Sequence, residues 1–437
     1  MSAEQHRIVI VGGGAGGLPL ATRLGDRYGR NGPVRVTLVD RQATHVWKPL
    51  LHEVAAGRMD ADLHDVDYPA IAHWHGFRFM QGALSGLDRA RREIVVDAVR
   101  SDGEEVLPQR VVGYDTLVIC VGSVSNDFGI PGVAQNAIPL DVADDAERFH
   151  RRLLAACVRA DARAANGQPA EVDIVIVGAG ATGVELAAEL RQTTRMHAGY
   201  GLEHLNPGRD IRITLLEAGP RILGPLSESL ASAAHELLQR LDIAVRVNQR
   251  VTAIDVEGVR TRDTFFRADL VVWAAGIKAP EILRSLDGLE VNRANQLMVG
   301  PTLQTTRDPS ILAFGDCAAA PWLGQAGAIL PPRAQVARQQ AVLLAKSIKA
   351  RLAQRPLPEF NFHDFGSLVS LGHLSAVGNL MGRLIGGSMM VQGLIARVMY
   401  ASLYKLHQVS IHGPVRVALD TIGRTLRRRL EPRVKLH

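Results

Sequence analysis

Cysteine is scarce in this chain of 437 residues, which contains three cysteines and no C-x-x-C pair. An odd number of cysteines without such a pair argues against a disulfide scaffold, a zinc ribbon and a dithiol relay, and we predict no metal site. An apolar signal-peptide core is also absent, because the polar stretch Met1–Arg7 leads directly into a strand pattern at Ile8. The protein is therefore expected to stay inside the cell.

Long uncharged segments and, near the C-terminus, acidic residues are also in short supply. The longest windows without a charged residue span 18, 16 and 13 positions, whereas a membrane-spanning helix needs about 20 predominantly apolar residues. Any membrane contact is therefore expected at the surface. Residues 376–437 carry ten Lys or Arg against two Asp or Glu, while the remaining chain carries 40 against 42. The excess of positive charge is therefore confined to residues 376–437, which we call the basic tail.

A strand, a glycine-rich turn, a helix and a second strand ending in an acid occur in that order twice. In each copy the glycines follow a strand and open a helix, which is the context that a dinucleotide-binding G-x-G-x-x-G motif requires. Residues 25–33 and 191–210 are predicted as inserted loops before the acids. The first copy contains Gly12, Gly13, Gly14, Ala15, Gly16, Gly17 and Asp40, and the second contains Gly178, Ala179, Gly180, Gly183 and Glu217.

The glycines have separate tasks in such a motif. The first makes a tight turn, the second lets the backbone approach a pyrophosphate, and the third lets the helix pack on the strand. The acid accepts a hydrogen bond from a ribose hydroxyl, so two units predict two dinucleotides. A carboxylate at Glu217 would repel a 2′-phosphate, which predicts NADH rather than NADPH. Arg221 lies nearby in the sequence, and because an arginine can accommodate a 2′-phosphate, the use of NADPH stays open as an alternative.

Three further segments complete the pattern of a two-dinucleotide flavoprotein. Thr306–Asp316 follows the pattern T-x4-I-x-A-x-G-D, in which a buried strand delivers Asp316 beside the flavin ribityl chain in that superfamily. Tyr114–Ser123 and Asp269–Gly276 resemble the strand-to-glycine element that closes a dinucleotide domain. Apolar spacing over 142–165 predicts a connector helix, a short-stranded segment is expected over 366–377, and helix is expected from Met389 onward.

The predicted fold class is α/β, with two Rossmann-like dinucleotide-binding domains of the disulfide-reductase type and a C-terminal membrane-associating helical region. We predict the first part of an FAD-binding domain over 1–125 and an NADH-binding domain with the connector helix over 126–295. The second part of the FAD-binding domain is expected over 296–363, and the membrane-surface region over 364–437.

Three segments, Trp47–Gly57, Gly276–Pro280 and Pro331–Gln339, resemble the type II NADH:quinone oxidoreductases, the single-subunit respiratory NADH dehydrogenases of bacteria. The resemblance runs from about Arg7 to His437 and is greatest to the enterobacterial type. It implies FAD-dependent oxidation of NADH, with two-electron reduction of a membrane quinone such as ubiquinone and without proton pumping.

The resemblance also implies roles for particular residues. The loop Gly12–Gly16 and Asp40 would hold the FAD phosphates and adenosine ribose, and the backbone of Ala83 would meet the adenine. Asp316 would hold the ribityl chain, and the Ala334 amide would face the flavin pyrimidine. The residues implied in catalysis are Glu185 near the nicotinamide and Gln335 and Gln339 at the quinone, with Gly276 in the NADH-binding part. Arg338 stands where some relatives have a histidine, which leaves a histidine proton donor there in doubt.

The basic tail contains apolar stripes suited to a membrane surface. A basic helix with an apolar face can lie among the headgroups of an anionic leaflet, on the cytoplasmic face of the inner membrane. Alternatively, this helix packs on its own protein, or on a second subunit to form a homodimer. Binding of nucleic acid is disfavoured because aromatic residues are sparse in the basic stretch. The stripe positions are Leu394, Ile395, Val398, Met399, Leu403 and Leu406, then Val415, Leu419, Ile422 and Leu426, with Arg416, Arg424, Arg427, Arg428 and Arg429 as cations.

Two other functions remain as alternatives. A sulfide:quinone or disulfide reductase would need paired redox cysteines beside the flavin, and only Cys317 is expected near it. A non-catalytic NADH sensor would bind the cofactor without turnover.

Overall fold

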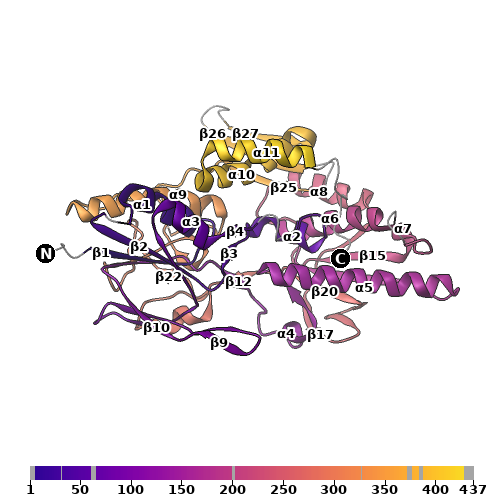
Figure 1. Cartoon of the computed structure of the whole chain (residues 1–437). Coiled ribbons are helices and arrows are strands. Elements are labelled where there is room, and N and C mark those ends of the chain that lie inside the picture. Colours follow the sequence, from indigo (N-terminus) through magenta and orange to yellow (C-terminus); the bar gives the residue numbers. More distant parts are fainter. Residues whose placement is uncertain are drawn as a thin grey trace.

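Two parallel β-sheets lie side by side, and a small third layer lies across the top of the molecule in Figure 1. The computed structural model describes residues 5–30, 32–60, 65–198, 202–325, 327–371, 376–382 and 387–427. The α/β class with two dinucleotide folds, predicted from the repeated motif, is confirmed. In the part of the chain that is described, no helix has both the length and the apolarity to cross a membrane.

The first sheet is built around β1, the strand that precedes the first glycine loop. Its neighbours on both sides are parallel to it, and their side chains are almost fully buried because helices cover one face and a small antiparallel sheet lies below (Figure 1). The strands, in spatial order, are β23 (Ile311–Ala313), β11 (Thr116–Ile119), β1 (His6–Val11), β2 (Val34–Asp40) and β5 (Arg78–Gln81). The covering helices are α1 (Gly17–Tyr28), α3 (Tyr68–His75) and α9 (Ala334–Leu352), and the antiparallel strands are β6 (Leu84–Asp88), β7 (Glu93–Val96) and β10 (Arg110–Gly113).

The second sheet repeats this plan around β14. Its strands are β13 (Ile138–Pro139), β20 (Leu270–Trp273), β14 (Val172–Val177), β15 (Ile211–Leu216) and β16 (Ile243–Arg246), all parallel. The predicted connector helix is α5 (Ala143–Ala165), which extends through this half to its right-hand end in Figure 1. The other helices are α6 (Ala181–Ala198), α7 (Pro207–Asp210) and α8 (Glu228–Arg240), beside an antiparallel sheet of β17 (Val251–Ile254), β18 (Gly258–Thr261) and β19 (Phe265–Arg267).

Two segments pack with the core of the other half of the molecule. The short helix α2 (Leu51–Ala55) lies within the predicted first domain, yet Leu51 and Val54 are buried in the apolar cluster of the second sheet. Conversely, Ala279 and Leu283 are buried in the cluster of the first sheet, before the predicted boundary at 295. Burial of apolar side chains, rather than chain order, therefore decides which core each segment joins.

The loops predicted before the two acids are partly helical. Helix α1 continues to Tyr28, and α6 continues through Ala198, so both predicted loops begin too early. The reason in α6 is that Leu190, Thr193 and Thr194 extend its buried face. Burial of these side chains favours continuation of the helix beyond the expected end.

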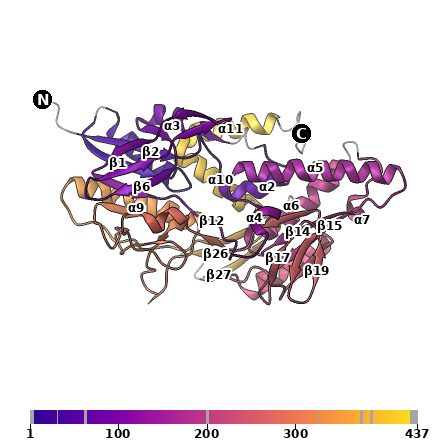
Figure 2. The same ribbon diagram turned by 90° about the horizontal axis from the view of Figure 1, so that it is seen from below.

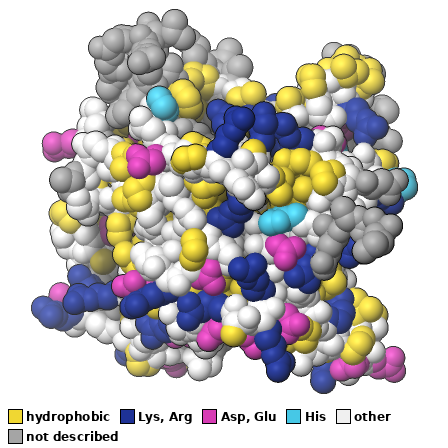
Figure 3. Space-filling model, turned by 90° about the vertical axis from the view of Figure 1, so that its left-hand side faces the viewer, with side chains coloured by type: hydrophobic (Ala, Val, Ile, Leu, Met, Phe, Trp, Pro, Cys, Tyr) yellow, Lys and Arg dark blue, Asp and Glu magenta, His cyan; other side chains and the backbone are white. Residues whose placement is uncertain are grey.

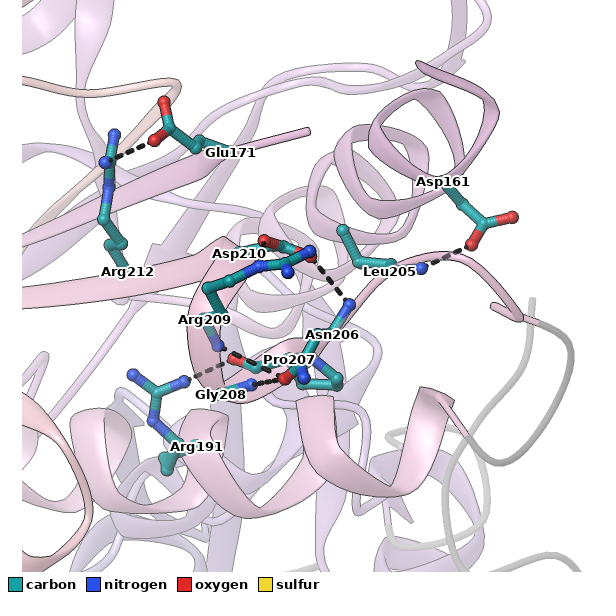
Figure 4. Close-up of polar contacts among 10 residues, drawn as sticks. All are labelled: Asp161, Glu171, Arg191, Leu205, Asn206, Pro207, Gly208, Arg209, Asp210 and Arg212. Carbon is teal, nitrogen blue, oxygen red and sulfur yellow. Dashed lines mark hydrogen bonds and ion pairs between the residues drawn. The ribbon is translucent and has the colours of Figure 1, made fainter. Parts of the chain in front are cut away.

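A buried arginine fixes the chain that follows α6. The Arg191 guanidinium donates hydrogen bonds of 2.8 and 2.9 Å to the carbonyl oxygens of Pro207 and Ile211, and of 2.9 Å each to those of Leu241 and Asp242. Figure 4 shows Arg191 directed at the turn that contains Pro207. Four carbonyls satisfy a charge that burial would otherwise penalise, so the ends of α7 and α8 are held to α6.

The C-terminal layer combines strands with two helices. The strands are β25 (Gly366–Ser370), β26 (Ala376–Gly382) and β27 (Gly387–Gln392), and the helices are α10 (Gly393–His412) and α11 (Pro414–Arg427). The prediction of helix from Met389 onward is wrong for the first positions, because β27 pairs with β26 over its whole length and α10 begins only at Gly393. Figure 2 shows α11 beside α3 of the first half.

Candidate functional site

The first glycine loop leaves space on one side and is tightly packed on the other. Gly12 has φ of +105°, and a Cβ there would lie 2.3 Å from the Cys120 carbonyl oxygen. A Cβ on Gly17 would lie 1.8 Å from the Gly12 carbonyl oxygen, whereas one on Gly14 would meet no protein atom within 4 Å. Only the middle glycine of the motif therefore faces open space, where a pyrophosphate can approach the backbone.

The second glycine loop has the same geometry. Gly178 has φ of +103°, and a Cβ on Gly183 would lie 1.9 Å from the Gly178 carbonyl oxygen. A Cβ on Gly180 would again meet nothing within 4 Å. The residues present fit two dinucleotides, one at each loop.

The two predicted acids are held in matching ways. Asp40 accepts a hydrogen bond of 2.6 Å from the Gly13 amide, and Glu217 accepts one of 2.9 Å from the Ala179 amide. Burial raises the pKa of Asp40, opposed by its backbone hydrogen bonds. Each carboxylate is thus anchored to the second residue of its own glycine motif, at the end of the adjacent strand.

Arg221 is engaged by its own loop. Its guanidinium donates to the carbonyl oxygens of Leu226, at 2.8 Å, and Gly224, at 2.7 Å. These contacts hold the arginine to its own loop, four residues after Glu217.

Asp316 lies in a polar network that joins three segments. Its carboxylate accepts a hydrogen bond of 2.8 Å from the Ser123 hydroxyl, and the Lys48 ammonium donates to the Ser123 carbonyl at 2.8 Å. The same ammonium lies 3.7 Å from the Asp141 carboxylate. Burial raises the pKa of Asp316, while Ser123 and the charge of Lys48 oppose that rise. The aspartate therefore stands where segments from both halves meet.

Three of the predicted residues lie in the first two turns of helix α9. Ala334 is its first residue, so its amide is among those that have no carbonyl partner within the helix. Gln335 is half-buried in the first turn. The Gln339 amide group bonds both main-chain groups of His363, donating to the carbonyl at 2.8 Å and accepting from the N–H at 3.1 Å. Gln339 therefore fixes the chain opposite α9.

Glu185 is buried between α6, α2 and β25. The residue is 7% exposed, and its carboxylate accepts a hydrogen bond of 2.9 Å from the Ser370 amide. The other carboxylate oxygen lies 3.6 Å from His52 Nδ1, and burial lowers the pKa of that histidine to about 4. The structure thus brings Glu185 to the junction of the second half with the C-terminal layer.

The remaining predicted residues form parts of the surrounding walls. Ala83 follows β5, and its carbonyl accepts from the Asp97 amide at 2.8 Å. A Cβ on Gly16 would lie 2.3 Å from the Phe314 ring, and one on Gly276, at φ +70°, would lie 2.5 Å from the Phe128 ring. These glycines are required by close packing.

None of the three cysteines forms a disulfide. All are free and buried. Burial raises the pKa of the Cys157 and Cys317 thiols to about 12 and that of Cys120 well above its usual value. Thiols held protonated are poor nucleophiles, which disfavours the disulfide-reductase alternative.

Sequence reasoning missed three contacts at this site. Lys48 stands within a motif that was singled out, but no role was assigned to it. Tyr68, whose hydroxyl donates to the Gly13 carbonyl at 2.9 Å, and the buried pair His45 and His407, with Nε2 atoms 2.9 Å apart, gave no signal. Nothing local in the sequence could have paired residues so far apart in the chain.

Comparisons with known proteins agree with this geometry. A family profile described as pyridine nucleotide-disulphide oxidoreductase matches residues 6–341. The type II NADH:quinone oxidoreductase of Haemophilus influenzae is 42% identical over 98% of this chain and 99% of its own length. The type II NADH:quinone oxidoreductase NdhA of Mycobacterium tuberculosis is 28% identical over 85% of this chain and 78% of its own.

Solved structures support the same fold. NDH2 from Plasmodium falciparum in complex with NADH has a TM-score of 0.79 at 18% identity, covering 96% of this chain and 98% of that one. The sulfide:quinone oxidoreductase of Aquifex aeolicus has a TM-score of 0.71 at 18% identity, covering 94% and 92%. The fold and paired glycine loops define a two-dinucleotide flavoprotein of the pyridine nucleotide-disulphide oxidoreductase class. Within that class, the chain belongs to the type II NADH:quinone oxidoreductase family.

Proposed function

We propose that this protein oxidises NADH and reduces a membrane quinone by two electrons, with FAD as its cofactor and without proton pumping. The observation that carries the proposal is the pair of matching glycine loops. Each loop is open beside its middle glycine, and the carboxylate at the end of the adjacent strand accepts a hydrogen bond from an amide of the loop. Family membership supplies the substrate class. The cysteines are buried, and burial raises the pKa of their thiols, which favours this reaction over a sulfide or disulfide acceptor.

The test is an absorption spectrum of the purified protein, recorded first alone, then with NADH, and then with a soluble quinone. We expect flavin bands that NADH bleaches and quinone restores, because the cofactor must take electrons from one substrate and give them to the other. Colourless protein that cannot be reconstituted with FAD would contradict the proposal. A bleached spectrum that quinone leaves unchanged would point instead to another acceptor.

We assign the residues of the first half to FAD. The loop Gly12–Gly17 and the amides that open α1 would face the pyrophosphate, and Asp40 would accept from the adenosine ribose. Ala83 would contact the adenine, Asp316 would orient the ribityl chain, and the Ala334 amide would donate to the flavin ring. A bound FAD would supply the two-electron chemistry, while these groups hold it in place.

The second half and the start of α9 would receive the substrates. Gly178, Gly180 and Gly183 would admit the pyrophosphate of NADH, with Gly276 in the same domain. Glu185 would lie near the nicotinamide, where its bond from Ser370 fixes its orientation. Gln335 would contact the quinone, and Gln339, through His363, would hold the opposite wall of that pocket.

NADH is expected to be used in preference to NADPH. A carboxylate at Glu217 accepts from a ribose 2′-OH but repels a 2′-phosphate, so we expect kcat/KM to favour NADH by at least about tenfold. The Glu217→Gln variant keeps an acceptor oxygen without the charge and should narrow the ratio. Steady-state rates with both cofactors measure it, and a wild-type preference for NADPH would overturn this assignment.

We further propose that α10 and α11 attach the protein to the cytoplasmic face of the inner membrane. Val415, Leu419 and Ile422 of α11 are strongly exposed and follow one face of the helix. The side chains of Leu394, Ile395, Val398, Leu403 and Leu426, like Arg428 and Arg429, lie outside the described residues.

Deleting 414–437 should release the protein from membranes and leave NADH oxidation by a soluble dye unchanged, because the described part of α11 packs on α10. Sedimentation with membranes measures the first effect, and the dye assay is the control. If the shortened chain still sediments with membranes, the assignment of α11 is wrong. If the apolar stripe of α11 instead forms a homodimer, the deletion should halve the molecular mass of the protein in solution.

A further inference from the structure

An exposed tryptophan joins the first half of the molecule to the C-terminal layer. Trp74 of α3 is 55% exposed, and the Arg416 guanidinium of α11 lies 5.1 Å from its ring centroid. The other tryptophans, Trp47, Trp273 and Trp322, are buried or half-buried. An exposed indole beside a guanidinium is thus a particular feature of the surface where α3 meets α11.

The apolar stripe of α11 borders this surface and is turned outward. Val415, Leu419 and Ile422 are 71%, 65% and 60% exposed. The opposite face is held by buried Val417 and by Asp420, whose carboxylate lies 3.8 Å from the Lys405 ammonium of α10. The stripe is therefore fixed in its outward orientation by packing on α10.

A row of arginines on α1 and just beyond its C-terminal end continues the same surface. Arg23 and Arg27 are exposed and lie one helical turn apart on α1, and the exposed Arg30 follows directly after Gly29, the residue that ends the helix. The Arg30 guanidinium lies 3.3 Å from the Nδ1 atom of His73, the neighbour of Trp74. The one acidic group among them, Asp26, is bonded to His75 at 2.7 Å. Figure 3 shows Lys and Arg side chains gathered between groups of hydrophobic ones near the top of this side of the molecule.

Arg338 of α9, to which the family resemblance assigns no role, lies near enough to Arg23 to be affected by its charge. Burial and then the charge of Arg23 lower its pKa. Among the described residues, neither Arg23 nor Arg338 forms an ion pair with a carboxylate. Two neighbouring guanidiniums without an acid leave a local excess of positive charge.

We propose that the lipid-contacting surface extends from the C-terminal helices onto the first half of the molecule, through Trp74 and the arginine row Arg23, Arg27 and Arg30. The occupant is a bilayer of anionic phospholipid. This inference rests on the proposed membrane attachment. Tryptophan favours the level of the headgroups, aliphatic side chains enter the acyl boundary, and arginines bind phosphate.

The charge pattern favours lipid over a second copy of the chain. In a twofold dimer the same patch meets itself, so the arginine rows of two copies would face each other. Like charges opposed across an interface cost several kcal/mol. An anionic leaflet supplies the opposite charge instead.

The first experiment measures tryptophan emission of the full-length, FAD-loaded protein with phosphatidylglycerol vesicles, with and without lipid brominated near the headgroup. We expect bromine to quench the emission of the wild-type protein and to leave the bound Trp74→Phe variant almost unquenched. Equal quenching in both proteins would overturn the proposal.

The second experiment compares two charge variants in vesicle sedimentation. Arg23→Gln/Arg27→Gln should weaken binding by roughly tenfold or more, since each cation near an anionic surface contributes substantially. Arg152→Gln/Arg159→Gln removes two exposed charges from α5, far from α11 in Figure 1, and should leave binding unchanged. Equal weakening by both pairs, or a halved mass in the α1 variant, would overturn the proposal.

Failure of the extended lipid surface can be distinguished from failure of the membrane attachment itself. If deletion of 414–437 abolishes vesicle binding while Trp74→Phe is quenched like the wild type, the extension to the first half is wrong and the membrane attachment stands. If the wild type does not bind these vesicles, both are wrong. The NADH and quinone spectra test the reaction independently of either result.

Discussion

Replacing Gly14 with alanine is expected to give a folded protein that holds little FAD. A methyl group at this position meets no protein atom within 4 Å, and Gly14 has no positive φ, so the chain itself should tolerate the change. The same methyl would stand where the backbone must approach a pyrophosphate. We expect at least about a hundredfold weaker FAD binding, equivalent to roughly 3 kcal/mol. The flavin-to-protein absorbance ratio and FAD titration of the apoprotein measure it.

Gly180→Ala is the matched control, since it adds the same methyl at the same place in the second motif. This variant should remain fully yellow and show a strongly raised KM for NADH. Both variants should keep the thermal stability of the wild-type apoprotein. In contrast, Gly17→Ala places a Cβ 1.8 Å from a carbonyl oxygen and should lose stability. A Gly14→Ala protein that binds FAD normally would show that the first loop is not the flavin site.

Lowering the pH from 6.5 towards 4 is expected to destabilise the fold strongly. Burial lowers the pKa of His45 and His52 to about 4 and that of His407 to about 2. In the unfolded chain these imidazoles titrate near 6.5, so between these values the unfolded state binds protons that the folded state does not. The stability that the neutral histidines provide is complete above pH 6.5 and decreases as the pH falls.

The expected loss is about 1.4 kcal/mol per pH unit for each imidazole that binds a proton only in the unfolded chain, which amounts to several kcal/mol at pH 5. That is comparable with the net stability of many domains. The pair His45 and His407 adds a geometric reason, because their Nε2 atoms are 2.9 Å apart and one must accept a hydrogen bond. Protonating the acceptor would place two donors face to face.

Thermal unfolding between pH 7 and 4.5 measures this effect. The double variant His45→Gln/His407→Gln should show a flatter dependence of Tm on pH, and His73→Gln, at an exposed position, should follow the wild type. An unchanged slope in the double variant would show that other groups cause the acid sensitivity.

Much of the candidate site can be predicted from short segments of the sequence. The two glycine motifs, the acids that end β2 and β15, and the strand that precedes Asp316 are read from short segments, because each depends on neighbours within one strand–turn–helix unit. The structure leaves Asp40 and Glu217 beside their own loops for the same reason. The connector helix was predictable because its apolar spacing continues over its whole length.

The sequence by itself determined the class of fold and the two dinucleotide loops, since strand patterns and glycine turns are local features. Only the tertiary structure decided which core α2 joins, that β27 is a strand, and that Glu185 meets Ser370. It alone paired His45 with His407 across 362 positions and set Trp74 against Arg416. Such contacts depend on how separate elements pack, and burial and strand pairing between distant segments leave no periodic trace in either segment alone.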